Sequence, residues 1–141
     1  NCKKGIRVKN RFLIDTNIFF EILLYQRKKH ICMDFLQNHS NDLSISYFSL
    51  HSIGIFLTHT GNSKLFRIFM NYISDSNSIL KILIIRYLDI VDFMNDWKLD
   101  YDDSYHFLLA LSNEQSFVTL DKDFRKAESN ISRIFLCSFT V

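Results

Sequence analysis

Short apolar runs alternate with longer amphipathic segments in this chain, and this alternation limits its fold more than any other sequence feature. Four runs rich in β-branched and aromatic residues have strand character, and they occupy residues 11–15, 42–46, 79–85 and 116–120. Apolar residues at helical spacing fill each interval between them. Such alternation favours a parallel sheet with helices on both faces. We therefore expect an α/β fold of three layers, with an edge strand at residues 131–139.

The bulk properties of the sequence are those of one folded domain. The 141 residues are 48% hydrophobic and carry a formal net charge of only +2, which is too mild to indicate a nucleic-acid partner by itself. Three cysteines at scattered positions indicate free thiols and not a disulfide framework or a zinc site. We expect a single domain over residues 1–141.

Several classes of protein are excluded by missing motifs. Three glycines leave no phosphate-binding loop and no dinucleotide-binding fingerprint. The apolar stretch 79–88 is too short to span a bilayer and is interrupted by Lys81 and Arg86. The five histidines have no paired zinc-ligand spacing, so most of them, including His106, are expected on the surface or partly packed. A cytoplasmic protein without a membrane anchor is the expectation.

Acidic residues stand where predicted strands end. Asp15 closes the first strand, Asp121 follows the strand at residues 116–120, and Asp102 and Asp103 open the helix before that strand. If the first and last of these strands are parallel neighbours, their carboxyl ends share one edge of the sheet, where ligands bind in folds of this class. Three carboxylates from distant parts of the chain would then meet.

Clustered carboxylates repel one another unless a cation lies among them, and oxygen ligands suit Mg²⁺ or Mn²⁺. Such ions promote phosphodiester cleavage. Each acid also has a purely structural explanation. Asp15 could support the start of the next helix, for which Thr16 or Asn17 is the expected cap, and Asp121 could hold a turn. We favour a functional role for Asp15, Asp103 and Asp121 together.

Four stretches resemble, in order, the signature blocks of PIN domains, and most closely those of VapC-type toxins. They are FLIDTNIF, LSISYFSLHSIGIFL, LDYDDSYHFLLAL and SFVTLDKDF, and they span residues 11–124. The resemblance implies a PIN-like fold and a Mg²⁺- or Mn²⁺-dependent endoribonuclease that cleaves single-stranded RNA. It assigns the acidic site to Asp15, Asp103 and Asp121, with support from Asn17 and Thr119. Asp123 is a further candidate near the metal.

The second block departs from the family pattern. PIN domains carry a glutamate there, whereas the matching position in this chain is read as His51, and no acid occurs between Asp42 and Asp75. His51 could ligate the metal, which would favour Mn²⁺, or it could bond to one of the aspartates, or it could have no role. Each alternative predicts weaker Mg²⁺ binding and reduced activity.

The resemblance also implies partners. RNA would be held by basic residues around the site, for which the candidates are Arg11, Lys122 and Arg125. An antitoxin protein would cover a groove between the helices that follow the first two strands, and a homodimer is expected. Two alternatives stay open: a PIN-like binding module that has lost catalysis, and an RNA-processing nuclease without an antitoxin.

Overall fold

Three short parallel strands form the sheet at the centre of the molecule. The computed structural model describes residues 12–75 and 86–121. The strands are β1 (Phe12–Ile14), β2 (Leu43–Ser44) and β3 (Ser116–Val118), in the order β2-β1-β3. Leu13 pairs with Ser44 on one side and with Phe117 on the other, and both pairings are parallel. The first and last of these strands are therefore neighbours, as the sequence predicts.

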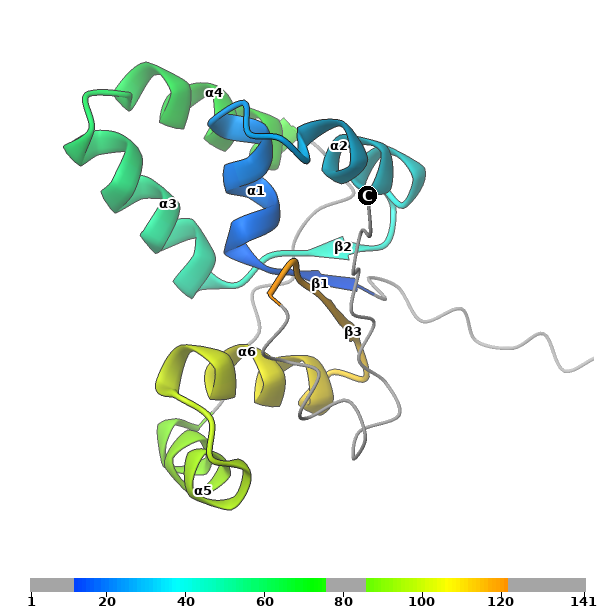
Figure 1. Ribbon diagram of the computed structural model, residues 1–141, viewed down its shortest axis with the longest axis vertical. Helices are drawn as coiled ribbons and strands as arrows, with labels where there is room; N and C mark the ends of the chain where they lie inside the picture. The colour runs from blue at the N-terminus through cyan, green and yellow to red at the C-terminus, as the bar shows by residue number, and fades with distance from the viewer. Residues whose placement is uncertain (1–11, 76–85, 122–141) are drawn as a thin grey trace, which may run out of the picture.

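Helices cover both faces of this sheet (Figure 1). The buried side chains of four helices belong to the core on one face and those of two helices to the core on the other, so the described residues form the three layers expected of an α/β fold. The helices are α1 (Thr16–Leu23), α2 (Lys29–Asn38), α3 (Tyr47–His59), α4 (Ser63–Asp75), α5 (Tyr87–Trp97) and α6 (Tyr101–Ser112).

The pleat of the strands divides the apolar side chains between two cores. Successive residues of a strand point to opposite faces of the sheet. Leu13 and Phe117 belong to a core with α5 and α6. Ile14 and Val118 belong to the other core, which α1, α2, α3 and α4 complete. All four side chains are fully buried, so the sheet is held from both sides.

The helices begin at the edge where the strands end. Ser46 caps α3 with its hydroxyl, which accepts from the backbone N–H of Ser49. The expected cap of α1 was wrong. Asp15 occupies that position and accepts from the backbone N–H of Thr16, because the side chains of Thr16 and Asn17 bond to other segments instead.

Two predicted strands, at residues 79–85 and 131–139, lie outside the described residues. Within the described ranges, no helix combines the length and the apolar character needed to cross a membrane.

The central strand supplies a test of the two-core arrangement. Leu13→Ala should lower the free energy of unfolding by about 2–5 kcal/mol, because Leu13 is fully buried and its removal leaves a cavity. The same substitution at Leu88, which is 69% exposed on α5, is the matched control and should cost less than about 0.5 kcal/mol. Equal losses in urea denaturation would contradict the assignment of Leu13 to the core.

Candidate active site

Two of the predicted site residues, Asp15 and Asp121, meet at the carboxyl edge of the sheet because β1 and β3 are parallel neighbours. Asp15 directly follows β1, and its backbone N–H donates to the carbonyl of Val118 over 2.9 Å. This bond continues the pairing one residue beyond the strands. Thr119 and Asp121, which follow β3, are thereby brought beside Asp15.

The carboxylate of Asp15 is fixed at both oxygens. Its Oδ1 accepts from the backbone N–H of Thr16 over 2.7 Å, and its Oδ2 accepts from the hydroxyl of Thr119 over 2.6 Å. Burial raises the pKa of Asp15, and the nearby charge of Asp121 raises it further. The imidazole of His106 and the two hydrogen bonds act in the opposite direction. Asp15 is thus a buried carboxyl held in a single orientation.

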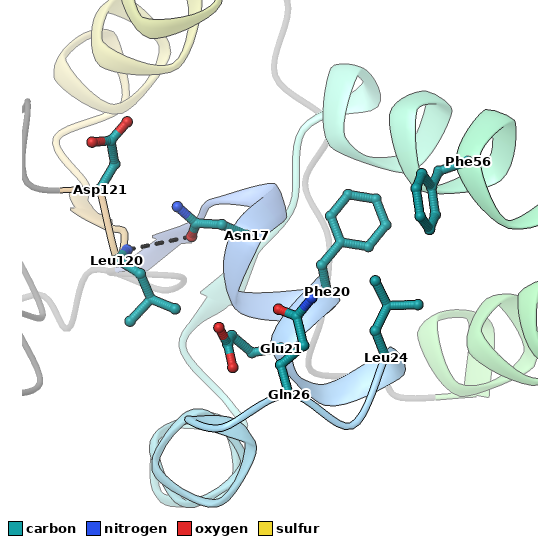
Figure 2. A pocket seen from close by; sticks show the side chains of 8 residues that line it. All are labelled: Asn17, Phe20, Glu21, Leu24, Gln26, Phe56, Leu120 and Asp121. Atoms are coloured by element: carbon teal, nitrogen blue, oxygen red, sulfur yellow. Dashed lines mark hydrogen bonds between the residues drawn. The ribbon is translucent and has the colours of Figure 1, made fainter.

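Thr119 and Asn17 connect the ends of the two strands. The Oγ1 of Thr119 accepts from Nδ2 of Asn17 over 3.1 Å and from the backbone N–H of Asp121 over 3.0 Å. The amide oxygen of Asn17 in turn accepts from the backbone N–H of Leu120 over 3.3 Å (Figure 2). The chain that leads to Asp121 is therefore bonded to α1 as well as to β1.

Asp103 reaches the same region from the first turn of α6. Its backbone N–H donates to Oδ1 of Asp100, the cap of that helix, over 2.9 Å. The pKa of Asp103 is raised to about 7, first by partial burial and then by the charges of Asp100, Asp121, Asp15 and Asp102. Each pair among Asp15, Asp103 and Asp121 therefore interacts electrostatically.

The three carboxylates are donors of the kind that a divalent metal ion prefers. Among residues 12–75 and 86–121, no three His, Cys, Asp or Glu side chains are already gathered closely enough to hold an ion. The donors do suit a hard divalent cation, since all three are carboxylates and their mutual repulsion would be offset by positive charge. An ion would have to draw the three side chains closer together.

The sequence analysis missed one residue of this region, His106, which was expected at the surface or partly packed. The side chain is 3% exposed. Its Nε2 lies 2.9 Å from Oγ of Ser46 and 3.1 Å from Oγ of Ser49, and its Nδ1 lies 3.1 Å from the backbone carbonyl of Asp102. Burial lowers the pKa of His106. The available signal was its spacing, three residues after Asp103 on one helix, which places both on the same face.

His51, by contrast, is exposed on α3. Ser49 faces the site, since the hydroxyl of Thr16 donates to its Oγ over 2.8 Å. His51 comes two residues later, about 200° around the helix from Ser49. The next residue on the site-facing side of α3 is Ser52, which is neutral. A metal-binding role for His51 stays a prediction, and so do the roles of Asp123, Arg11, Lys122 and Arg125, which lie outside the described residues.

An open pocket of about 500 Å³ lies beside the acidic region. Figure 2 shows that α1 lines it with Asn17, Phe20 and Glu21, and that Leu24, the residue directly after the helix, continues the same side. The pocket is completed by Gln26, Phe56, Leu120 and Asp121. The rings of Phe20 and Phe56 meet edge to face at 5.0 Å, which joins α1 to α3. The pocket thus has an apolar end between these helices and an acidic end at Asp121.

Comparison with known proteins agrees with this fold. One solved structure with the same fold is a toxin–antitoxin complex from Klebsiella pneumoniae. It has 17% sequence identity and a TM-score of 0.65, over 88% of this chain and 95% of that chain. A second is a crystal structure of a protein from Pyrobaculum aerophilum, with 14% identity and a TM-score of 0.61, over 89% of this chain and 87% of that chain. No curated protein matches the sequence.

The family model of the PIN domain matches residues 12–130, which is most of the chain. The matched region contains all four sequence blocks and the whole described sheet. The expected fold class is confirmed, and the chain belongs to the PIN domain family.

Proposed function

We propose that this protein is a metal-dependent endoribonuclease that cleaves single-stranded RNA and serves as the toxin of a type II toxin–antitoxin pair. PIN domains are generally nucleases, and this chain belongs to that family. The observation that carries the proposal is the convergence of Asp15, Asp103 and Asp121. They come from three distant segments, and the charge of Asp121 raises the pKa of both Asp15 and Asp103.

Asp15, Asp103 and Asp121 would hold Mg²⁺ or Mn²⁺, with Asp123 as a further candidate. In phosphodiester cleavage such an ion supplies an activated water and offsets the charge of the leaving oxygen. Thr119 and Asn17 would keep Asp15 in one orientation through the bonds described above. Preorganised groups of this kind lower the cost of assembling the site for reaction.

The surroundings of the acids favour a phosphate group despite the negative charges. The amino ends of α1 and α3 meet here, since the hydroxyl of Thr16 donates to Ser49. The first turn of α6 is joined to them through His106, which contacts both Ser49 and the backbone carbonyl of Asp102. Helix amino ends carry partial positive charge and bind phosphates. Arg11, Lys122 and Arg125 would add contacts to the RNA backbone.

An antitoxin protein is the proposed partner. One structure that shares the fold is a toxin–antitoxin complex. The pocket beside Asp121 lies between the helices that follow the first two strands, where an antitoxin segment is expected, and Phe20, Leu24 and Phe56 give it an apolar end. Ile55 is exposed on α3 next to Phe56 and is a further candidate contact. A homodimer is also proposed, from family membership alone.

A binding module without catalysis is the second candidate function. The observation that favours it is the side of α3 that faces the site, where the first two turns present Ser49 and Ser52 and no carboxylate. An RNA-processing nuclease without an antitoxin would share the site but would not arrest growth when expressed alone.

Cleavage of a labelled single-stranded RNA in Mn²⁺ or Mg²⁺ separates these functions. Asp103→Asn and Asp121→Asn should each lower the rate at least about 100-fold, because each removes a carboxylate that would hold the ion on which charge stabilisation in the transition state depends. Asp34→Asn, at an exposed acid of α2, is the control and should cleave like the wild type. Absence of cleavage in the wild type supports the binding module. Cleavage that survives both site variants places the activity elsewhere.

Thermal unfolding tests the metal site without catalysis. At pH 8 and without metal, Asp103→Asn should raise the melting temperature by about 2–5 °C, because a partly buried and mutually repelled charge is removed. Added Mn²⁺ should raise the melting temperature of the wild type but not of the variant. Equal stabilisation of both proteins by Mn²⁺ would contradict the role of Asp103 as a ligand.

The antitoxin pocket is tested by co-expression with the product of the adjacent open reading frame. Phe56→Asp should keep RNA cleavage but weaken the complex by about tenfold or more, since it places a charge in an apolar contact. Ile68→Asp, at a 65% exposed apolar residue of α4, is the matched control. Rescue from growth arrest should fail for Phe56→Asp only. Full rescue of that variant would exclude this pocket as the antitoxin groove.

A further inference from the structure

A buried polar network joins the amino ends of three helices behind the acidic region. His106 of α6 contacts Ser46 and Ser49 of α3 through Nε2, at 2.9 and 3.1 Å. Ser49 accepts from the hydroxyl of Thr16, the first residue of α1, over 2.8 Å. Ser46, Ser49 and His106 are all buried. The network is therefore shielded from water, which would otherwise compete for each bond.

The bonding partners specify how the imidazole is protonated. The backbone carbonyl of Asp102 can only accept, so Nδ1 of His106 must carry a hydrogen to bond it over 3.1 Å. In the neutral ring Nε2 is then an acceptor, and it takes the hydroxyl hydrogen of Ser46 or Ser49. Ser46 also accepts from the backbone N–H of Ser49 over 3.0 Å. Burial lowers the pKa of His106 and so favours the neutral ring, which is then a bridge with one donating and one accepting side.

Both ends of this bridge lie next to a carboxylate of the site. Asp102, whose carbonyl takes the Nδ1–H bond, directly precedes Asp103. Thr16, at the other end, follows Asp15 and donates its backbone N–H to the Asp15 carboxylate. The hydrogen bonds therefore run from the backbone carbonyl of the residue before Asp103 to the side-chain hydroxyl of the residue after Asp15.

Packing alone does not determine this arrangement. The His106 ring stacks on Phe117 at 5.5 Å and meets Phe48 edge to face at 5.3 Å. An apolar side chain of similar volume could keep most of that contact, but it could not reproduce bonds of fixed direction to α3 and to the first turn of α6. Repulsion among the three carboxylates tends to separate these helix ends, and the network opposes it.

We propose that His106 is a positioning residue, which keeps the segments that carry Asp103 and Asp15 near each other by bridging α6 to α1 through Ser46 and Ser49, so that a metal ion can draw the two carboxylates together. The inference rests on the proposed metal-dependent function. The simpler alternative is a core histidine whose bonds contribute to stability only. A positioning role predicts that loss of the bridge weakens metal binding even when the protein stays folded. A purely stabilising role predicts that metal binding by the folded protein is unchanged.

Two substitutions separate these roles. His106→Leu keeps an apolar side chain of similar size and removes every hydrogen bond of the ring. His106→Gln keeps an acceptor for the serine hydroxyls and serves as the conservative rescue. His106→Leu should weaken Mn²⁺ binding, measured by calorimetry, by about tenfold or more, and His106→Gln by no more than about threefold. In His106→Leu the kcat for RNA should fall while KM stays unchanged, because the buried ring does not reach RNA. Mn²⁺ binding by His106→Leu as tight as that of the wild type would overturn the proposal.

Failure of the wild type to bind Mn²⁺ would refute the metal site itself. The bridge between α6 and α1 can be tested separately by measurements that need no metal. Nitrogen NMR of the metal-free wild type should show the proton of His106 on Nδ1. Exchange of the Thr16 amide hydrogen should be about tenfold faster in His106→Leu than in the wild type, and near normal in His106→Gln. A proton on Nε2, or unchanged Thr16 exchange in His106→Leu, would overturn the bridge between α6 and α1.

Discussion

The parallel pairing of β1 with β3 is the constraint on which the site depends. These strands are separated by about a hundred residues of chain, yet their pairing continues to the bond between Asp15 and Val118. One residue further, the hydroxyl of Thr119 binds the Asp15 carboxylate. A shift of this register by one residue would turn Leu13 and Phe117 out of their core and would move Thr119 to the wrong face. The same apolar burial that stabilises the sheet therefore aligns the polar residues at its edge.

The site combines an unfavourable electrostatic arrangement with several bonds that oppose it. Three carboxylates lie near one another, and the pKa of Asp103 rises to about 7, first through partial burial and then through the charges of neighbouring aspartates. The Asn17–Thr119 bond, the cap of α1 and the network around His106 hold the helix amino ends together against this repulsion. A fold that maintains such repulsion without metal is suited to bind a cation, and this agrees with the nuclease activity general to PIN domains.

Much of this arrangement could be predicted from the sequence. Alternating strand and helix patterns led to the parallel sheet, and the positions of Asp15 and Asp121 directly after strands led to their meeting at one edge. Local rules left the cap of α1 open among Asp15, Thr16 and Asn17, since all three residue types can cap a helix. The bonds of Thr16 and Asn17 to Ser49 and Thr119, which are 33 and 102 residues away, could not be predicted in this way. His106 was missed for the same reason. Its helix is apolar on several sides, and only the tertiary fold brings the serines of α3 to its ring. His51 shows a different limit of the sequence. The block that contains it matches the family, but the match does not determine which side of α3 faces the site.

The central claim is that Asp15, Asp103 and Asp121 share one divalent ion. Anomalous diffraction from crystals grown with Mn²⁺ tests it most directly. The account predicts a single strong peak at the carboxyl edge of the sheet, with oxygens of all three aspartates at roughly 2.0–2.3 Å. A peak elsewhere, or one ligated by fewer than two of these aspartates, would contradict it.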